Sequence, residues 1–249
     1  MLNRIAPDSH IVDLSHLVPP LDVLSGASLL VDSLPYIADD AVVLAIVDPN
    51  VGKDREIAIE AASGRFLVGP DNGLLAPAWT ALGGVGKAVE IASEDVIVQP
   101  VSPSFRARDT LCPGAAQLAS GTPLDQLGPH IDPSTLTELT VPEPETHAGR
   151  IRCEVVEFNR FGNVKLNVRE AHLAAAGLGD TEKLEVEAAS GSTKARRGST
   201  YADFEPGEYG VIFDPRGWLM VVRGNPESAL QGLGLATGDP VWLSAPSAG

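Results

Sequence analysis

The feature that most constrains this chain is an unbroken apolar run from Val42 to Val47, which stops at Asp48-Pro49. A run of this length, rich in β-branched residues, is typical of a strand buried on both faces. Proline cannot donate to a strand ladder and pushes the preceding residue into extended backbone, so the predicted strand ends with Asp48 at its carboxyl end. Ligands bind at that end of the strands in open α/β sheets, and Asp48 is therefore the first candidate site residue.

A second polar loop follows soon after the first. Residues 57–62 alternate and predict a half-exposed strand, Ser63-Gly64 turns the chain, and residues 66–68 return it as another strand. The stretch Pro70-Asp71-Asn72-Gly73 is then a strong turn signal ahead of an apolar helix. Polar loops that follow strands in this way often carry functional residues.

Residues 1–125 are predicted to form an α/β domain with a mostly parallel, Rossmann-like sheet, because strands and helices alternate along them. The glycine-rich stretch 83–87 lacks the spacing of a phosphate-binding loop and is predicted as a plain loop. The other elements expected in this domain are strands at 10–14 and 96–98 and helices at 22–34, 74–82 and 113–119.

Prolines punctuate the polar stretch that follows, so residues 126–149 are predicted to be a linker between two domains. Beyond it, short segments with period-two alternation and Gly/Pro turns predict an all-β domain, a small barrel or sandwich, at 150–249. A basic cluster at 194–197 is predicted to lie in a solvated loop. The strands expected in this domain are 151–155, 164–168, 184–188, 209–213, 218–222 and 241–243.

Composition argues against several classes of function. The chain has 18 Lys and Arg against 33 Asp and Glu, and its net charge of −15 repels nucleic-acid backbones. Cys112 and Cys153 are too few for a disulfide framework, which favours reduced thiols and a cytoplasmic protein. No apolar run approaches membrane-spanning length, and the histidines do not cluster, so neither a membrane partner nor a metal site is predicted.

Several motifs follow one another along the chain: IVDLSHLVPPLDVLSGASLL (11–30), VDPNVGKDR (47–55), FLVGPDNGLL (66–75), SFRARD (104–109), NRFGNVKLNV (159–168), and TYAD with PRGWLMVVRGNPESA (200–229). These motifs, in this order, resemble those of the S-adenosylmethionine (SAM) hydroxide adenosyltransferases, the adenosine-forming SAM hydrolases, which are related to fluorinases and chlorinases. The resemblance implies an α/β N-terminal domain, a C-terminal β-barrel, and a homotrimer with SAM sites between the N-domain of one subunit and the C-domain of the next.

The reaction that the resemblance implies is attack of water or hydroxide on the ribose 5′ carbon of SAM, which releases methionine and forms adenosine. SAM is the substrate, and no cofactor is implied. The sulfonium is already a good leaving group, so the site must supply a positioned, partly desolvated oxygen nucleophile. Asp48 and Arg55 match the family residues that hold this water, and Arg55 is expected to keep Asp48 ionised.

Three departures from the family pattern bear on catalysis. Arg106 stands where the family has the histidine of its water-holding set, and arginine can donate to the water but cannot act as a base. Asn159 replaces an aspartate that holds the methionine amino group, and a neutral amide binds an ammonium less strongly. Nothing in the sequence corresponds to the family's first strand with its T-D-F-G-like motif.

Other positions match family residues that bind substrate. Asn163 matches a residue near the adenosine, Arg216 matches an arginine that holds the methionine carboxylate, and the backbone around Asn225 is implied to face the adenine edge. Asp71 and Asn72 lie in the second polar loop, where a structural turn is an equal interpretation.

Arg106 is open to two interpretations, because the neighbouring Arg108-Asp109 is an alternative organiser of the same loop. The sequence as a whole predicts a SAM hydrolase. The main alternative, from another class, is a catalytically degenerate SAM- or adenosine-binding protein, which Arg106, Asn159 and the unmatched first strand favour. A third alternative is a SAM-dependent halogenase; halogenases carry an uncharged residue at the position of Asp48, which argues against it.

Overall fold

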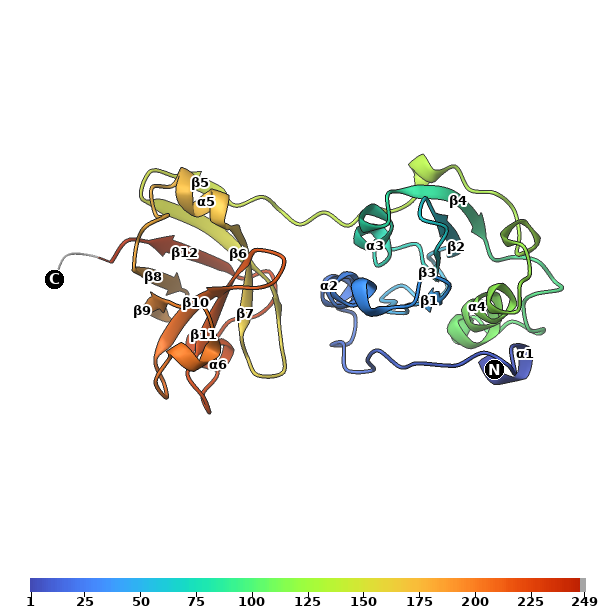
Figure 1. Cartoon of the computed structure of the whole chain (residues 1–249), viewed down its shortest axis with the longest axis horizontal. Helices are drawn as coiled ribbons and strands as arrows, with labels where there is room; N and C mark the ends of the chain where they lie inside the picture. Colours follow the sequence, from blue (N-terminus) through green and yellow to red (C-terminus); the bar gives the residue numbers. More distant parts are fainter. Residues whose placement is uncertain (247–249) are drawn as a thin grey trace. The chain divides into compact units, whose positions relative to one another are not determined.

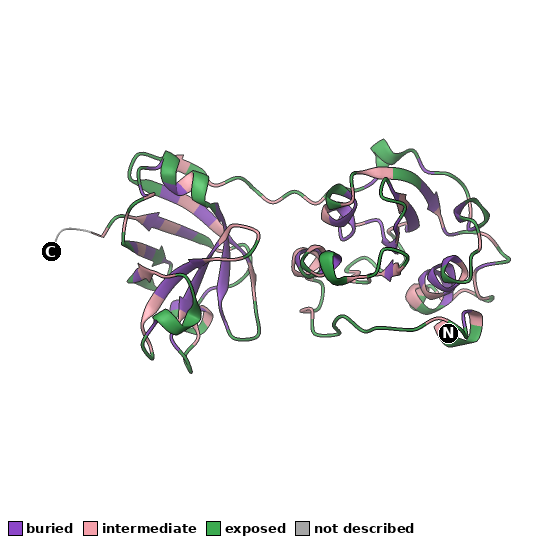
Figure 2. Cartoon of the chain, in the orientation of Figure 1, coloured by how far each residue is buried: buried purple, intermediate pink, exposed green. Residues whose placement is uncertain are grey.

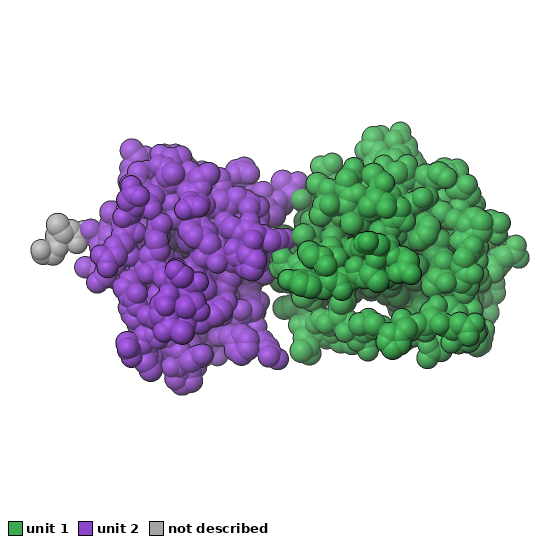
Figure 3. All heavy atoms as spheres, in the orientation of Figure 1, with its two compact units in different colours: residues 1–139 green, residues 140–249 purple. Residues whose placement is uncertain are grey.

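The chain divides into two compact units, Met1–Leu139 (unit 1) and a second that begins at Thr140 (unit 2) (Figure 3). The structure is a computed structural model that describes residues 1–246. The division falls inside the stretch 126–149 predicted as a linker, yet Leu127, Ile131 and Leu136 are buried in the cores of unit 1. The first half of that stretch is therefore part of the packed unit.

The elements of each unit are labelled in Figure 1. Unit 1 holds α1 (Leu2–Ile5), α2 (Val23–Ser33), η1 (Leu34–Tyr36), β1 (Val42–Leu44), β2 (Glu56–Ala61), β3 (Phe66–Pro70), α3 (Ala76–Ala81), β4 (Val85–Glu90), the π-helical turn η2 (Ala107–Leu111), α4 (Cys112–Ala119), η3 (Leu124–Gln126) and η4 (Pro133–Thr135). Unit 2 holds β5 (Glu145–His147), β6 (Arg150–Phe158), β7 (Val164–Arg169), α5 (Glu170–Ala175), β8 (Lys183–Ala188), β9 (Gly191–Arg197), η5 (Tyr201–Asp203), β10 (Tyr209–Phe213), β11 (Trp218–Arg223), α6 (Ala229–Leu233) and β12 (Pro240–Ser244). None of the helices described in residues 1–246 has the length and apolar character needed to cross a membrane.

The sheet of unit 1 is mixed rather than mostly parallel. Its strand order is β1-β3-β2-β4; β1 runs parallel to β3, whereas β2 is antiparallel to both β3 and β4. The prediction of a mostly parallel, Rossmann-like sheet is therefore wrong for the described residues. The cause is local, because the tight turn at Ser63-Gly64 joins β2 directly to β3, and such a turn can connect only antiparallel neighbours.

Two predicted strands of unit 1 do not form. Residues 10–14 are exposed and pair with no strand of the sheet. Among the described strands, the edge strand β1 pairs only with β3. Residues 96–98 pass from a turn through a bend into irregular backbone instead of forming a strand. Conversely, β4 occupies much of the stretch 83–87 that was predicted as a plain loop, because Ala88 and Val89 are buried against β2.

Both faces of this sheet are covered, which makes β2 a buried strand rather than the half-exposed one predicted. Ile57 and Ile59 pack with α2 and α3 on one face, and Ala58 packs with α4 on the other (Figures 1 and 2). Asp22 caps α2, since its Oδ1 accepts a 2.9 Å hydrogen bond from the Ser25 amide. The result is a layer of helix, sheet and helix around two apolar cores.

Unit 2 contains a closed seven-stranded barrel, as the resemblance implied. The strand order is β12-β8-β9-β10-β11-β7-β6, and β12 also pairs with β6, which closes the ring, while β5 extends β6 on one side. Alternate residues such as Val164, Leu166 and Val168 of β7 fill the interior. Closure removes the unpaired edges that an open sheet would expose.

The basic cluster 194–197 is part of β9 rather than a solvated loop. Ala195 is buried inside the barrel, and the flanking Lys194 and Arg196 point outward, where Arg196 donates a 2.8 Å hydrogen bond to Glu208. Inward and outward side chains do alternate along β9, but in the sequence the single inward alanine stands within a run of basic residues, so the alternation is hard to recognise. Cys112 is half-buried and Cys153 is buried, and both are free thiols.

Truncation of Leu166 in the barrel core should destabilise unit 2 strongly. Leu166 is fully buried, so L166A should lower the free energy of unfolding by about 2–5 kcal/mol through lost burial and a residual cavity. Urea unfolding followed by circular dichroism measures this loss. Lys194 is exposed on β9, and K194A should change the same quantity by less than about 0.5 kcal/mol; equal effects of the two substitutions would contradict the described core.

Candidate active site

β1 ends at Leu44, short of the predicted end at Val47, and Asn72 fixes the backbone that leads from β1 to Asp48. Its Nδ2 donates to the Val47 carbonyl at 2.8 Å, and its Oδ1 accepts from the Leu74 amide at 3.2 Å. One amide side chain thus ties the loop after β3 to the loop after β1. In the structure Asn72 therefore shapes the site's backbone.

Asp48 is half-buried at the start of the 48–55 loop. Its Oδ1 accepts a 2.9 Å hydrogen bond from the Asn50 amide, which forms a local turn of the kind favoured by aspartate. Burial raises the pKa of the Asp48 carboxyl above its ordinary value, the Asn50 amide offsets part of this effect, and the nearby carboxylates Asp54 and Glu56 raise it further. This direction is opposite to the effect expected of Arg55.

Arg55 is engaged by Asp71 instead of by Asp48. Its Nε and Nη2 donate to Asp71 Oδ2 at 2.9 and 2.5 Å, and Nη2 also donates to the Thr135 carbonyl at 2.7 Å. The Asp71 side chain is only 3% exposed, and its other oxygen accepts from the Thr137 amide at 2.8 Å. This pair therefore joins three segments of unit 1.

Arg106 forms a second ion pair at the same end of the sheet. It lies just before η2, and its Nε donates to Glu56 Oε1 at 2.6 Å while Nη2 donates to the other oxygen. Glu56 is the first residue of β2, directly after Arg55, and is buried. Sequence reasoning missed Glu56; the available signal was an acidic residue at the start of an otherwise apolar strand.

The neighbouring Arg108-Asp109 pair organises the loop that carries Arg106. Arg108 donates to both oxygens of Asp109 at 2.6 and 2.8 Å, and the Ser102 amide donates to the same carboxylate at 2.9 Å. These contacts lower the pKa of Asp109 to about 2. The loop also touches the 48–55 loop, because a Cβ on Gly52 would lie 3.1 Å from the Pro103 carbonyl. Asp48, Arg55, Asp71, Asn72 and Arg106 are thus carried by segments in mutual contact.

In unit 2, Asn159 shapes the hairpin between β6 and β7. Its Oδ1 accepts from the amides of Phe161 and Asn163 at 3.0 and 3.2 Å. The hairpin rests on the loop after β11, because the Gly162 carbonyl accepts from the Leu230 amide at 2.9 Å and a Cβ on Gly162 would collide with Ser228. That loop carries the exposed Asn225, so Asn163 and Asn225 belong to adjoining segments.

Arg216 lies at the opposite end of β11 from Asn225. It sits in the turn between β10 and β11, where its amide donates to Asp214 Oδ1 at 2.9 Å and its carbonyl accepts from Arg169 at 2.8 Å. The side chain is half-buried. Unit 2 therefore carries its candidates in two groups, separated by the length of one strand.

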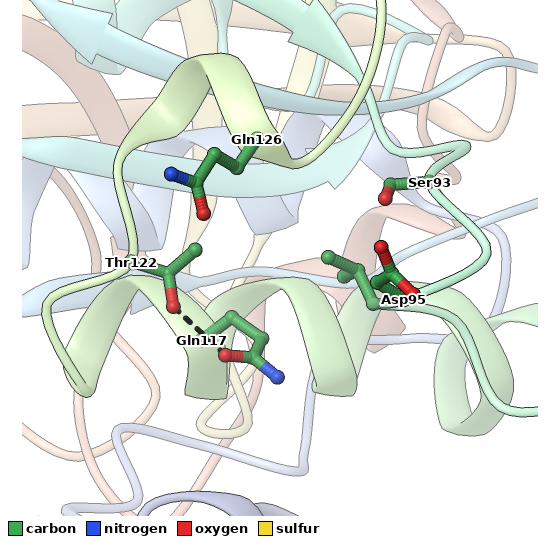
Figure 4. A pocket seen from close by; sticks show the side chains of 6 residues that line it. Ser93, Asp95, Gln117, Thr122 and Gln126 are labelled. Atoms are coloured by element: carbon green, nitrogen blue, oxygen red, sulfur yellow. Dashed lines mark hydrogen bonds between the residues drawn. The ribbon is translucent and has the colours of Figure 1, made fainter.

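No predicted site residue lines the hollow shown in Figure 4. It has a volume of about 350 Å³ and is bordered by Ser93, Asp95, Val96, Gln117, Thr122 and Gln126 of unit 1, with Gln117 and Thr122 hydrogen-bonded to each other. In the part of the chain that the structure describes, no group of three or more His, Cys, Asp and Glu side chains is arranged to hold a metal ion.

The elevated pKa of Asp48 can be measured by titrating its side-chain carboxyl carbon by NMR. The midpoint should lie above the ordinary aspartate value of about 3.9, and D54N should move it down by removing one neighbouring negative charge. Asp95 is an exposed aspartate of the same unit, so D95N should leave the midpoint unchanged. A midpoint below the ordinary value would show that a cation neutralises Asp48 after all.

Comparison with known proteins gives a consistent result for both units. Residues 1–128 match the SAM hydroxide adenosyltransferase N-terminal domain, and residues 153–242 match the SAM hydroxide adenosyltransferase C-terminal domain. The curated (R)-S-adenosyl-L-methionine hydrolase of Salinispora tropica is 41% identical over 246 residues, which cover 98% of this chain and 90% of that protein. A fluorinase of an Actinoplanes species is 26% identical over 204 residues, covering 72% and 68% of the two chains.

The fold is also found among solved structures. The crystal structure of an uncharacterized conserved protein from Thermotoga maritima has a TM-score of 0.83 to this chain at 27% identity, covering 98% of this chain and 92% of the other. Sequence and structure comparisons therefore agree over nearly the full length. The two domain matches span most of residues 1–242, and this chain belongs to the SAM hydroxide adenosyltransferase family.

Proposed function

We propose that this chain hydrolyses SAM to adenosine and methionine by attack of water or hydroxide on the ribose 5′ carbon. The observation that carries the proposal is the cluster at one end of the unit 1 sheet, where a half-buried aspartate of raised pKa lies among segments tied by two arginine–carboxylate pairs. Family membership supports the reaction, as does the hydrolase name of a relative 41% identical to this chain.

Asp48 is the group we assign to the nucleophile. A carboxylate can accept a hydrogen bond from the attacking water, orient it toward the carbon, and complement the positive sulfonium. No general acid is needed, because methionine leaves as a neutral thioether. Arg55 and Arg106 hold their places through Asp71 and Glu56, so their role is to fix and polarise the water site rather than to exchange protons.

The unit 2 candidates suit the two ends of an elongated ligand. We assign the methionine carboxylate to Arg216, whose planar guanidinium can bind a carboxylate with two parallel hydrogen bonds. Asn163 and the backbone at Asn225 are assigned to the adenosine end. The two groups flank the six residues of β11, a span of roughly 20 Å at about 3.3 Å per residue. Asn159 and Asp71 make structural hydrogen bonds, and we place them and Asn72 in support of the pocket rather than in contact with its reacting atoms.

Two alternatives differ from the hydrolase in what they would form from SAM. A halogenase would need to bring an anion beside Asp48, which would repel it, and the fluorinase relative matches a smaller share of the chain than the hydrolase relative does. A degenerate binding protein would bind SAM without turnover; the commitment of Arg106 to Glu56 is the structural feature that favours it.

Incubation of the purified chain with SAM, with and without chloride, tests the proposal directly. We expect adenosine and methionine in equal amounts and no 5′-chloro-adenosine, as measured by liquid chromatography. The variant D48A should lower kcat by about 100-fold or more, the range of a positioned acid–base group, while Kd for SAM changes by only a few fold. D95A, at an exposed aspartate of the same unit, serves as the matched control. Binding of SAM without any product would support the degenerate protein instead.

We further propose a cytoplasmic homotrimer with its SAM sites between subunits. The free thiols of Cys112 and Cys153 suit a reducing compartment. The subunit arrangement follows from the family resemblance, and closed cyclic symmetry is the usual form of soluble homo-oligomers.

Co-expression of two inactive variants tests whether subunits share a site. D48A and R216Q should each be impaired alone, and a mixed assembly should recover activity because some sites combine an intact Asp48 with an intact Arg216. Random assembly gives roughly one quarter of the wild-type rate, since each contributing subunit is intact in half of the cases. Light scattering reports the trimeric mass. Sites contained within one subunit would give no recovery.

A further inference from the structure

Lys165 is a buried cation on the outside of the barrel. It lies in β7 between Val164 and Leu166, which fill the interior, so its side chain points to the outer face. There it pairs in register with Met220, a member of a small outer apolar cluster with Phe204, Ile212 and Val222. The side chain is only 7% exposed. A buried ammonium is costly unless it is paired, so its contacts are informative.

Two carboxylates hold this ammonium. Lys165 Nζ lies 2.7 Å from Glu157 Oε1 on β6 and 3.0 Å from Asp214 Oδ2 at the end of β10. The Asp214 side chain is as buried as that of Lys165. Lys165 therefore joins β6, β7 and the β10–β11 turn through charge-assisted hydrogen bonds.

Asp214 uses its second oxygen to build the turn that carries Arg216. Oδ1 accepts from the Arg216 amide at 2.9 Å and from the Trp218 amide at 2.8 Å. One carboxylate thus meets Lys165 with one oxygen and the backbone of the turn with the other. The position of the Arg216 backbone depends on the rotamer of Asp214, and that rotamer depends on Lys165.

Arg169 secures the same turn from the other side. It donates to the Arg216 carbonyl at 2.8 Å, and its guanidinium carbon lies 3.9 Å from the centre of the Trp218 ring. Asp214 accepts from the Arg216 amide and Arg169 donates to the Arg216 carbonyl, so the backbone of Arg216 is held on both sides of its Cα atom. These contacts hold the turn in one conformation. They therefore set the direction in which the Arg216 side chain leaves the backbone.

We propose that Lys165 is a positioning residue for carboxylate recognition: through Asp214 it fixes the backbone from which Arg216 reaches the methionine carboxylate. The inference rests on the proposed function, in which Arg216 binds that carboxylate. Loss of Lys165 would leave the buried Asp214 and the half-buried Glu157 without their shared cation, and their repulsion would displace the turn.

The variant K165M tests this role with two substrates, SAM and decarboxylated SAM, which lacks the carboxylate. We expect KM and Kd for SAM to rise roughly tenfold, the loss typical of one charge-assisted hydrogen bond, while kcat stays near wild type. Values for decarboxylated SAM should stay within about twofold, because this ligand offers Arg216 no carboxylate to bind. In an R216Q background, K165M should add no further loss for SAM.

The control is K194M, the same substitution at an exposed lysine of the same barrel, which should leave both substrates unaffected. If K165M fails to fold, D214N replaces it, because asparagine keeps the oxygen that accepts from the turn amides and removes the charge that pairs with Lys165; the same difference between the substrates is expected. Equal weakening of both substrates, or no change for either, would overturn the proposal and leave Lys165 with a structural role.

Binding measurements keep this result separate from the proposed hydrolysis. Calorimetric Kd values for the two ligands need no turnover, so the difference between them can be read even if the wild-type protein forms no adenosine. Absence of adenosine from wild type, with a selective loss of SAM affinity in K165M, would overturn the hydrolase function and retain the positioning role.

Discussion

The candidate site depends on buried carboxylates that hold arginine-bearing segments in place. Asp71 joins Arg55 to the segment at Thr135–Thr137, Glu56 holds Arg106, and Asp214 holds the Arg216 turn. The Asp71, Glu56 and Asp214 side chains are 3%, 5% and 7% exposed, so their contacts add little net stability when they form, yet loss of a partner would leave a buried charge uncompensated. These interactions therefore act mainly by excluding other loop conformations.

This arrangement decides the electrostatic state of Asp48. The hydrogen bonds that the structure describes for the Arg55 and Arg106 side chains go to Asp71, Thr135 and Glu56, and none goes to Asp48. Asp48 is left half-buried near two other carboxylates, which is why its pKa rises. A carboxylate without a close cationic partner keeps its lone pairs available for a water molecule. A carboxylate that accepts two hydrogen bonds from one arginine has fewer lone pairs available.

The sequence predicted the features that depend on local chemistry and missed those that depend on pairing. The strand that begins at Val42 and the two strands of the β10–β11 hairpin were predictable because apolar runs and period-two alternation act over a few residues, although β1 ends at Leu44 instead of at Val47. The parallel sheet was wrong because strand direction is set by which strands become neighbours. For Ala195 in β9 and Lys165 in β7, only the closed barrel shows that the first is interior and the second is a buried cation.

Family motifs pointed to candidate site residues but could not show which contacts each one makes. Asn159 matches a substrate-binding position, yet in this structure its side-chain oxygen accepts hydrogen bonds from two amides of its own hairpin.

The raised pKa of Asp48 means that its ionised carboxylate does not stabilise the folded chain. Because the folded-state pKa lies above the unfolded value, the stability that the protonated carboxyl contributes is present below the unfolded pKa and is lost as pH rises through the folded pKa. At neutral pH an ionised, half-buried Asp48 therefore lowers the stability of the fold, as expected of a group placed for the chemistry proposed above rather than for packing.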